Sequence, residues 1–262
     1  MRKQEILTPY ERVLIARKIG RNGIMDFISA LFDDFLELHG DRLFRDDPAI
    51  IGGIATFHGT PVTVVGHRKG KNTEENIACN FGMASPEGYR KAVRLMEQAE
   101  KFSRPVITFI DTPGAYPGTE AEANGQSNAI AESIAFMSRL KVPTIAVVTG
   151  EGSSGGALAI AVADSVWMLE NAVYSILSPE GFASIMWKDA KRAEEAAAIM
   201  KLTAGELKEL GLVDGVIPEG KNCIKYMDRV LSAELTRLGR MSKNALVSSR
   251  YEKFRTIDQG KK

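Results

Sequence analysis

A glycine- and serine-rich segment, residues 149–158, carries the residue types and spacing most suited to chemistry in this chain. It follows an almost wholly apolar run at 144–148 and opens an apolar stretch at 154–163, so it predicts a turn from a buried strand into a helix. Backbone N–H groups at a helix start lack partners within the helix and can hold a phosphate, a carboxylate or a developing oxyanion. The alternative is that these glycines serve only tight packing between strand and helix.

The same segment fits two other motifs. A Gly-x-Gly-x-x-Gly pattern at 150–155, with Glu170 about 20 residues later, fits a dinucleotide fingerprint, although an extended stretch rather than a helix follows Glu170. A Gly-x-Ser-x-Gly pattern around Ser154 fits the nucleophile elbow of serine hydrolases. Every histidine precedes that serine, which leaves an unusual order that would use His67 and Asp111. Both hypotheses stay open at this point.

A second loop, residues 111–118, follows the apolar run 106–110 and reads Asp-Thr-Pro-Gly-Ala-Tyr-Pro-Gly. Its Asp-x-x-Gly start resembles a GTPase switch, but the chain has no Gly-x-x-x-x-Gly-Lys-Ser/Thr loop, which disfavours nucleoside triphosphate chemistry. Both loops should lie at the carboxyl ends of adjacent parallel strands, the usual ligand edge of an α/β sheet. Two loops of backbone amides without a nearby His or Cys favour stabilisation of an oxyanion such as an enolate or a ureido anion.

The hydrophobic patterns predict the elements that position these loops. Apolar strands that alternate with helices indicate an α/β domain with a mainly parallel sheet covered on both faces. We expect helices at 8–20, 26–38, 86–102, 122–140, 154–163, 179–187, 190–200 and 204–210, and a helical C-terminal region. We expect strands at 50–57 and 62–65 as a hairpin, and at 106–110, 144–148, 166–169, 173–177 and 213–217.

Composition excludes several classes of function. The chain has 34 Lys and Arg against 33 Asp and Glu, and its net charge of +1 argues against non-specific binding to nucleic acid or to an anionic membrane. Its two cysteines, Cys79 and Cys223, lie far apart and form no CxxC pair, so we expect no zinc site. The longest apolar run, 152–163, is too short to cross a bilayer, so we expect a cytoplasmic protein. The basic run 67–71 either contacts an anion or is solvated surface charge.

Six motifs occur in a fixed order between about residues 26 and 218, and together they resemble one family. They are GHRKG at 66–70, NFGM at 80–83, PEGYRKA at 86–92, DTPGAYPG at 111–118, GEGSSGGALAI at 150–160 and SPEG at 178–181. The series is similar to the carboxyltransferase alpha subunits of the multi-subunit bacterial acetyl-CoA carboxylases. Six motifs in series are far more specific than any single glycine loop.

The resemblance implies a crotonase-like (ClpP/crotonase) α/β fold of repeated ββα units with N-terminal helices. It implies a single carboxyltransferase domain over 1–262, with an N-terminal helical segment at 1–45, a crotonase-like core at 46–220 and a C-terminal helical region at 221–262. The implied reaction transfers the carboxyl group from carboxybiotin on a carrier protein to acetyl-CoA. The product is malonyl-CoA, and the reaction is the first committed step of fatty acid synthesis.

The resemblance also implies site residues and partners. The backbone amides of Gly155 and Gly156 would form the oxyanion hole, and Gly114 and Ala115 would line the carboxybiotin cleft. The implied partners are a zinc-containing beta subunit in an alpha2beta2 heterotetramer, the biotin carboxyl carrier protein and biotin carboxylase, with no metal in this chain. The alternatives are another crotonase-like acyl-CoA decarboxylase or hydratase, and a non-catalytic assembly subunit. A hydratase would need a free acid or base, whereas we expect Glu151 to cap the helix or form a salt bridge.

Overall fold

The computed structural model describes residues 7–257, and its centre is one sheet of eight strands. The strands follow the order β1-β2-β3-β4-β5-β6-β8, and β7 pairs with the end of β5. β1, β2 and β3 are antiparallel, and the pairs from β3 to β8 are parallel. The strands are β1 (Asp33–Glu37), β2 (Ile50–Phe57), β3 (Thr60–His67), β4 (Val106–Thr112), β5 (Thr144–Ser153), β6 (Ser165–Leu169), β7 (Val173–Ser175) and β8 (Gly215–Ile217).

Helices flank the sheet, and several begin at the residues that the sequence marks. Thr8 caps the first helix in a capping box with Glu11, and proline occupies the first turn. The helices are α1 (Pro9–Ala16), α2 (Ile24–Leu31), α3 (Thr73–Ala78), α4 (Pro86–Lys101), α5 (Thr119–Ala123), α6 (Gln126–Arg139), α7 (Ser154–Leu158), α8 (Pro179–Trp187), α9 (Ala193–Met200), α10 (Ala204–Glu209), α11 (Cys223–Gly239) and α12 (Lys243–Thr256). Two 3₁₀ turns, η1 (Asn80–Gly82) and η2 (Ala190–Arg192), complete the set.

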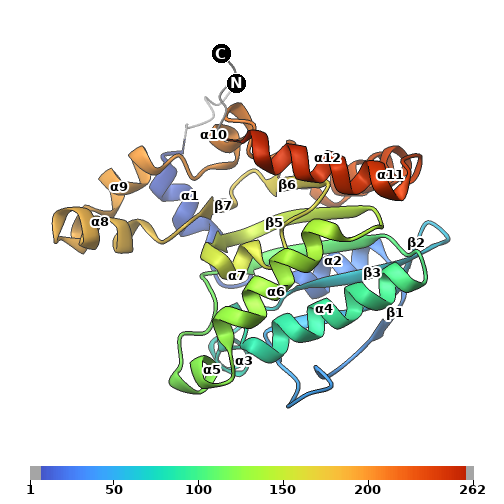
Figure 1. The fold of residues 1–262 in the computed structure, drawn as a ribbon. Helices are drawn as coiled ribbons and strands as arrows, with labels where there is room; N and C mark the ends of the chain where they lie inside the picture. The colour runs from blue at the N-terminus through green and yellow to red at the C-terminus, as the bar shows by residue number, and fades with distance from the viewer. Residues whose placement is uncertain (1–6, 258–262) are drawn as a thin grey trace.

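The sheet is covered on both faces (Figure 1). α4 and α6 pack against each other on the face turned toward the viewer, whereas α2 lies behind the sheet. Phe27 of α2 stacks on Phe109 of β4 with ring centroids 5.5 Å apart. Gly66 of β3 permits the close approach of α2, because a Cβ there would lie 2.6 Å from Cδ1 of Ile24. The mainly parallel α/β sheet predicted from the strand pattern is therefore confirmed.

Several predicted helices are wrong in part, and the first of them, expected at 8–20, ends at Ala16. The helix expected at 26–38 ends at Leu31, and residues 33–37 form β1, because the open edge of β2 satisfies their backbone groups. The helix expected at 154–163 ends at Leu158, and the buried residues 159–163 form a turn into β6. The helix expected at 122–140 is two helices, since Gly125 between them has φ +84°.

Smaller differences occur nearer the C-terminus. The start of the helix expected at 190–200 is the 3₁₀ turn η2, and the strand expected at 213–217 covers only 215–217. The C-terminal region is helical, as expected, within the described residues. Residues 1–6 of the expected N-terminal segment and 258–262 of the C-terminal region lie outside that part of the chain.

One buried arginine attaches the C-terminal helix to the rest of the domain. Arg250 of α12 is 1% exposed, and its guanidinium forms a two-pronged ion pair with Asp164 at 2.9 and 2.8 Å. It also donates to the carbonyl oxygens of Met137 and Leu140, which end α6. α12 is therefore fixed to the turn that precedes β6 and to the end of α6.

Candidate active-site cleft

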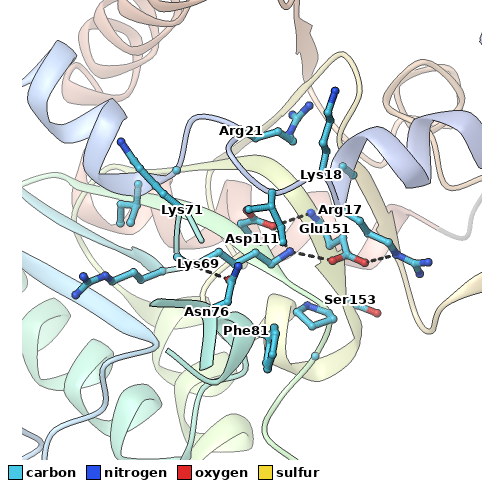
Figure 2. A pocket seen from close by; sticks show the side chains of 18 of the residues that line it. Arg17, Lys18, Arg21, Lys69, Lys71, Asn76, Phe81, Asp111, Glu151 and Ser153 are labelled. Atoms are coloured by element: carbon cyan, nitrogen blue, oxygen red, sulfur yellow. Dashed lines mark hydrogen bonds and ion pairs between the residues drawn. The ribbon is translucent and has the colours of Figure 1, made fainter. Parts of the chain in front are cut away.

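A cavity of about 860 Å³ lies at the carboxyl ends of β4 and β5, where the two predicted loops emerge. Figure 2 shows charged side chains from several elements converging on it. The first loop contributes Asp111, Pro113, Gly114 and Ala115, and the second contributes Glu151, Ser153 and Ser154. Other walls come from the α1–α2 connection, residues 68–71 after β3, Phe81 of η1 and residues 176–178.

The structure brings the four predicted site residues together, but they do not all line the cavity. Gly114 and Ala115 lie in its wall. Gly155 and Gly156 lie behind that wall, in the first turn of α7. The Ser153 side chain at the start of this helix makes no capping hydrogen bond. A Cβ on Gly156 would lie 2.5 Å from the nitrogen of Ala115, so the two loops are in direct backbone contact. First-turn N–H groups of α7 have no partner within the helix.

A chain of ion pairs ties both loops to the N-terminal helix (Figure 2). The Lys69 ammonium lies 2.7 Å from an Asp111 carboxylate oxygen and 2.8 Å from Glu151 Oε2. Arg17, just after α1, donates from Nε to Glu151 Oε1 at 2.8 Å and from Nη1 to Glu180 Oε1 at 2.8 Å. The Glu151 backbone N–H also donates to Asp111 at 3.0 Å. The expectation that Glu151 forms a salt bridge is confirmed.

These contacts keep the network ionised. Burial alone raises the pKa of Glu151, but Lys69 and Arg17 outweigh it and hold that pKa below its ordinary value. Burial also disfavours the charged form of Lys69, yet the charges of Asp111 and Glu151 raise its pKa. The hydrogen bonds from Arg17 lower the pKa of Glu180 to about 2. Glu151 is thus held as a carboxylate by two cations, which removes it as a free acid or base.

The two alternative motifs lack their chemical partners. Ser154 has φ +59°, a strained value that a nucleophile elbow would share. However, His67 is fully buried, and neither of its ring nitrogens is hydrogen-bonded to Asp111 or Ser154. Burial, with the charge of Lys69 second, lowers the pKa of His67 to about 3. The Glu170 carboxylate of the dinucleotide hypothesis accepts a hydrogen bond from the Glu219 backbone, and β7 rather than a helix follows it.

Residues 7–257 hold neither a metal-binding cluster nor a membrane-spanning helix. No group of three or more His, Cys, Asp or Glu side chains in that range is arranged to hold a metal ion, and Cys79 and Cys223 are buried and unpaired. None of the helices in the same range is both long and apolar enough to span a membrane.

Sequence reasoning missed the charged half of the site. Arg17 lies 134 positions from Glu151, and its helical pattern predicts only which face of α1 is buried. Lys69 lies in the basic run 67–71, for which an anion contact and a solvated surface remained equal alternatives. Only its position shortly after β3, at the sheet edge where Asp111 lies near the end of β4 and Glu151 near the end of β5, could have indicated its partners.

The fold is that of the crotonase-like carboxyltransferases. A structure of transcarboxylase 12S with methylmalonyl-coenzyme A bound has a TM-score of 0.71 and 21% sequence identity, and the match covers 86% of this chain and 44% of that one. A Pseudomonas malonate decarboxylase heterodimer has a TM-score of 0.64 and 20% identity, with 80% of this chain and 89% of that chain covered. These structures share the fold of this chain, and the likeness concerns the fold alone.

Within that class, residues 2–258 match the model of the acetyl co-enzyme A carboxylase carboxyltransferase-like family, and the chain belongs to that family. A relative from Clostridium acetobutylicum, the alpha subunit of acetyl-coenzyme A carboxylase carboxyl transferase, is 56% identical over 265 residues. That match covers 98% of this chain and 97% of the relative. The alpha subunit of Streptococcus thermophilus is 58% identical over 244 residues, which cover 92% of this chain and 95% of the relative. The family expected from the six motifs is confirmed.

Proposed function

We propose that this chain is the alpha subunit of a carboxyltransferase that moves a carboxyl group from carboxybiotin on a carrier protein to acetyl-CoA, giving malonyl-CoA. The observation that carries the proposal is the contact of Gly156 with the 111–118 loop at the cavity wall. It places two amide-bearing loops at one cleft. The identity of 56–58% to alpha subunits over nearly the whole chain supports the same reaction.

The residues present fit a biotin ring. The cavity of about 860 Å³ is within the usual range for small-molecule sites. Gly114 has φ +145°, and no heavy atom lies within 4 Å of where its Cβ would be, so a flat ring can approach the backbone there. Carboxybiotin, when bound, supplies the carboxyl group and, through its ring nitrogen, the base. This chain then needs no side-chain base of its own.

The role of the protein is to stabilise developing negative charge. The N–H groups of Gly155 and Gly156 would donate to the oxygen on which that charge develops, and the loop at Gly114 and Ala115 would orient the ring. Preorganised amides of this kind act without reorganisation and gain strength when water is excluded. The ion pairs of Lys69 and Arg17 hold both loops in place and occupy the carboxylates of Asp111 and Glu151.

The proposal includes partners that complete the enzyme. A zinc-containing beta subunit supplies the acyl-CoA side of the site in an alpha2beta2 assembly, and the carrier protein and biotin carboxylase deliver the carboxyl group. An acyl-CoA hydratase is disfavoured because Glu151, the carboxylate of the Gly155 segment, is held by two cations. A non-catalytic assembly subunit would not need an open cavity at the glycine loops.

Reconstitution of the forward reaction tests this function. The chain is mixed with the beta subunit and the carboxylated carrier protein of the same organism, and malonyl-CoA is measured by mass spectrometry after addition of acetyl-CoA. We expect malonyl-CoA only when the chain, the beta subunit and the carrier are all present. Formation of malonyl-CoA without this chain, or none in the full mixture, would contradict the proposal.

A further inference from the structure

Lys69 contacts the ends of two neighbouring site strands at once. It follows β3, and its ammonium bridges Asp111 near the end of β4 and Glu151 near the end of β5. Its side chain is 19% exposed, and the carboxylates are 13% and 12% exposed. Ion pairs with so little exposure are screened far less than surface pairs.

The two carboxylates begin the two loops that form the cleft. Asp111 immediately precedes residues 112–118, and Glu151 precedes the turn into α7. Asp111 also accepts the Glu151 backbone N–H at 3.0 Å, and its carboxylate fills the space where a Cβ of Gly150 would lie. Without a cation between them, two carboxylates this close would repel each other and separate the loops.

We propose that Lys69 is a positioning residue that fixes the distance between the 111–118 loop and the 149–158 loop by neutralising Asp111 and Glu151. The inference rests on the proposed carboxyltransferase function and adds a residue that acts through the loops without touching the reacting atoms. Arg17 contributes from the other side, but it divides its guanidinium between Glu151 and Glu180.

Removal of the cation makes a specific pH-dependent prediction. The charged and titratable groups around the pair are Lys69 and His67 from the β3 end, Arg17 after α1 and Glu180 of α8. In Lys69→Met, Arg17 remains as a cation of the cluster, and the pair of carboxylates, now without Lys69 between them, takes up one proton at low pH more readily than in the wild type. That proton restores a contact between the loops. It is lost as the pH rises, and the carboxylates then repel each other.

The experiment uses this chain in complex with its beta subunit and measures biocytin-dependent decarboxylation of malonyl-CoA from pH 5.5 to 8. The quantity compared is kcat/KM relative to the wild-type complex, which removes the pH dependence of the reaction itself. We expect this ratio for Lys69→Met to fall about 10-fold or more between pH 5.5 and 8. Lys69→Arg, which keeps the charge, should retain most of the activity at both pH values.

The decisive variant is the double substitution Lys69→Met with Glu151→Gln. The double substitution removes both the cation and the repulsion between the two carboxylates. Its kcat/KM relative to the wild-type complex should therefore be independent of pH and higher than that of Lys69→Met at pH 8. If Lys69 were needed only for folding, Lys69→Met would lower activity equally at every pH, and adding Glu151→Gln would not restore it. Lys201→Met, at an exposed ion pair with Glu206 on the surface, is the matched control and should leave the ratio unchanged.

The outcomes separate this inference from the function on which it rests. If the wild-type complex turns over but Lys69→Met stays within twofold of it at all pH values, the positioning role is wrong. The same holds if the double variant is no more active at pH 8 than Lys69→Met. If Lys69→Met does not co-purify with the beta subunit, the activity of the double variant alone tests the positioning role. If neither variant assembles with the beta subunit, the inference is overturned. A wild-type complex without turnover overturns the proposed function and this role with it.

Discussion

The backbone of Gly156 lies directly against the backbone nitrogen of Ala115, so that a Cβ on Gly156 would lie 2.5 Å from that nitrogen. The same Cβ would lie 2.8 Å from the Gly114 carbonyl carbon and from the Tyr89 hydroxyl oxygen. Backbone cannot yield as a flexible side chain does, so any side chain at Gly156 must separate the two loops. The requirement for glycine here is a requirement for contact between them.

Gly156→Ala should therefore abolish most turnover while leaving the assembly with the beta subunit intact. We expect a loss of roughly 10²–10³ in kcat, the scale of losing one oxyanion-hole donor. Gly155→Ala should cost less, because its Cβ would meet only Ile130 Cγ2 at 3.4 Å. Gly205→Ala in α10 is the control, since nothing lies within 4 Å of its Cβ position, and it should keep wild-type turnover. Unchanged turnover in Gly156→Ala would show that Gly156 has no catalytic role.

Arg250→Met should destabilise the fold by about 3–5 kcal/mol in urea unfolding. The substitution leaves the Asp164 carboxylate, 4% exposed, without its two-pronged partner, and it leaves the carbonyl oxygens that end α6 without donors. Arg237→Met removes an exposed ion pair with Glu234 and should cost less than about 1 kcal/mol. Equal losses for the two variants would mean that the buried contacts of α12 contribute little to stability.

His67 should make the stability of the chain depend on pH. Its pKa is about 3 in the folded protein against 6.5 as the ordinary value, because burial disfavours the charged ring. The unfolded chain therefore binds the extra proton first, and stability that is complete above pH 6.5 is lost as the pH falls toward 3. Between pH 7 and 4.5 the loss should be about 2–3 kcal/mol.

Urea unfolding across this pH range measures the effect. His67→Gln, which cannot take up a proton, should flatten the slope of the unfolding free energy against pH between pH 7 and 4.5. A slope that His67→Gln leaves unchanged would assign the acid sensitivity to other groups.

Ser154→Gly should raise the thermal unfolding midpoint. Ser154 has φ +59°, a conformation that is sterically unfavourable for serine because of its Cβ and that glycine adopts without strain. Ser103 has φ +54° in the turn after α4, far from the cleft in sequence, and Ser103→Gly should raise the midpoint similarly. A lower midpoint for Ser154→Gly alone would show that the serine side chain holds the turn into α7.

Local patterns predicted the strands and loops of the site because these features depend on residues that are close together in the sequence. The apolar runs before residues 111 and 149 are long enough to identify buried parallel strands, and parallel strands bring their following loops to one edge. The contact of Gly156 with the 111–118 loop follows from that arrangement. Glycine spacing alone also allowed the dinucleotide and hydrolase hypotheses, which only the burial of His67 and the contacts of Glu170 weaken.

Features that depend on distant partners could not be predicted in this way. The stretch 33–37 continues the helical spacing of Phe27, Leu31 and Phe35, yet it forms β1 because the edge of β2 would otherwise lack a neighbour. Arg17 and Arg250 look like ordinary charged residues of amphipathic helices. Their partners, Glu151 and Asp164, lie 134 and 86 positions away, and periodicity predicts a buried face without saying what covers it.

The most direct test of the central claim is biocytin-dependent decarboxylation of malonyl-CoA, measured for this chain alone, for the beta subunit alone and for the two together. The account predicts turnover only in the mixture, with saturation by biocytin that Gly156→Ala abolishes. Turnover by this chain alone would mean that it holds a complete acyl-CoA site, and turnover of the mixture that needs no biocytin would contradict its assignment as the biotin-binding half.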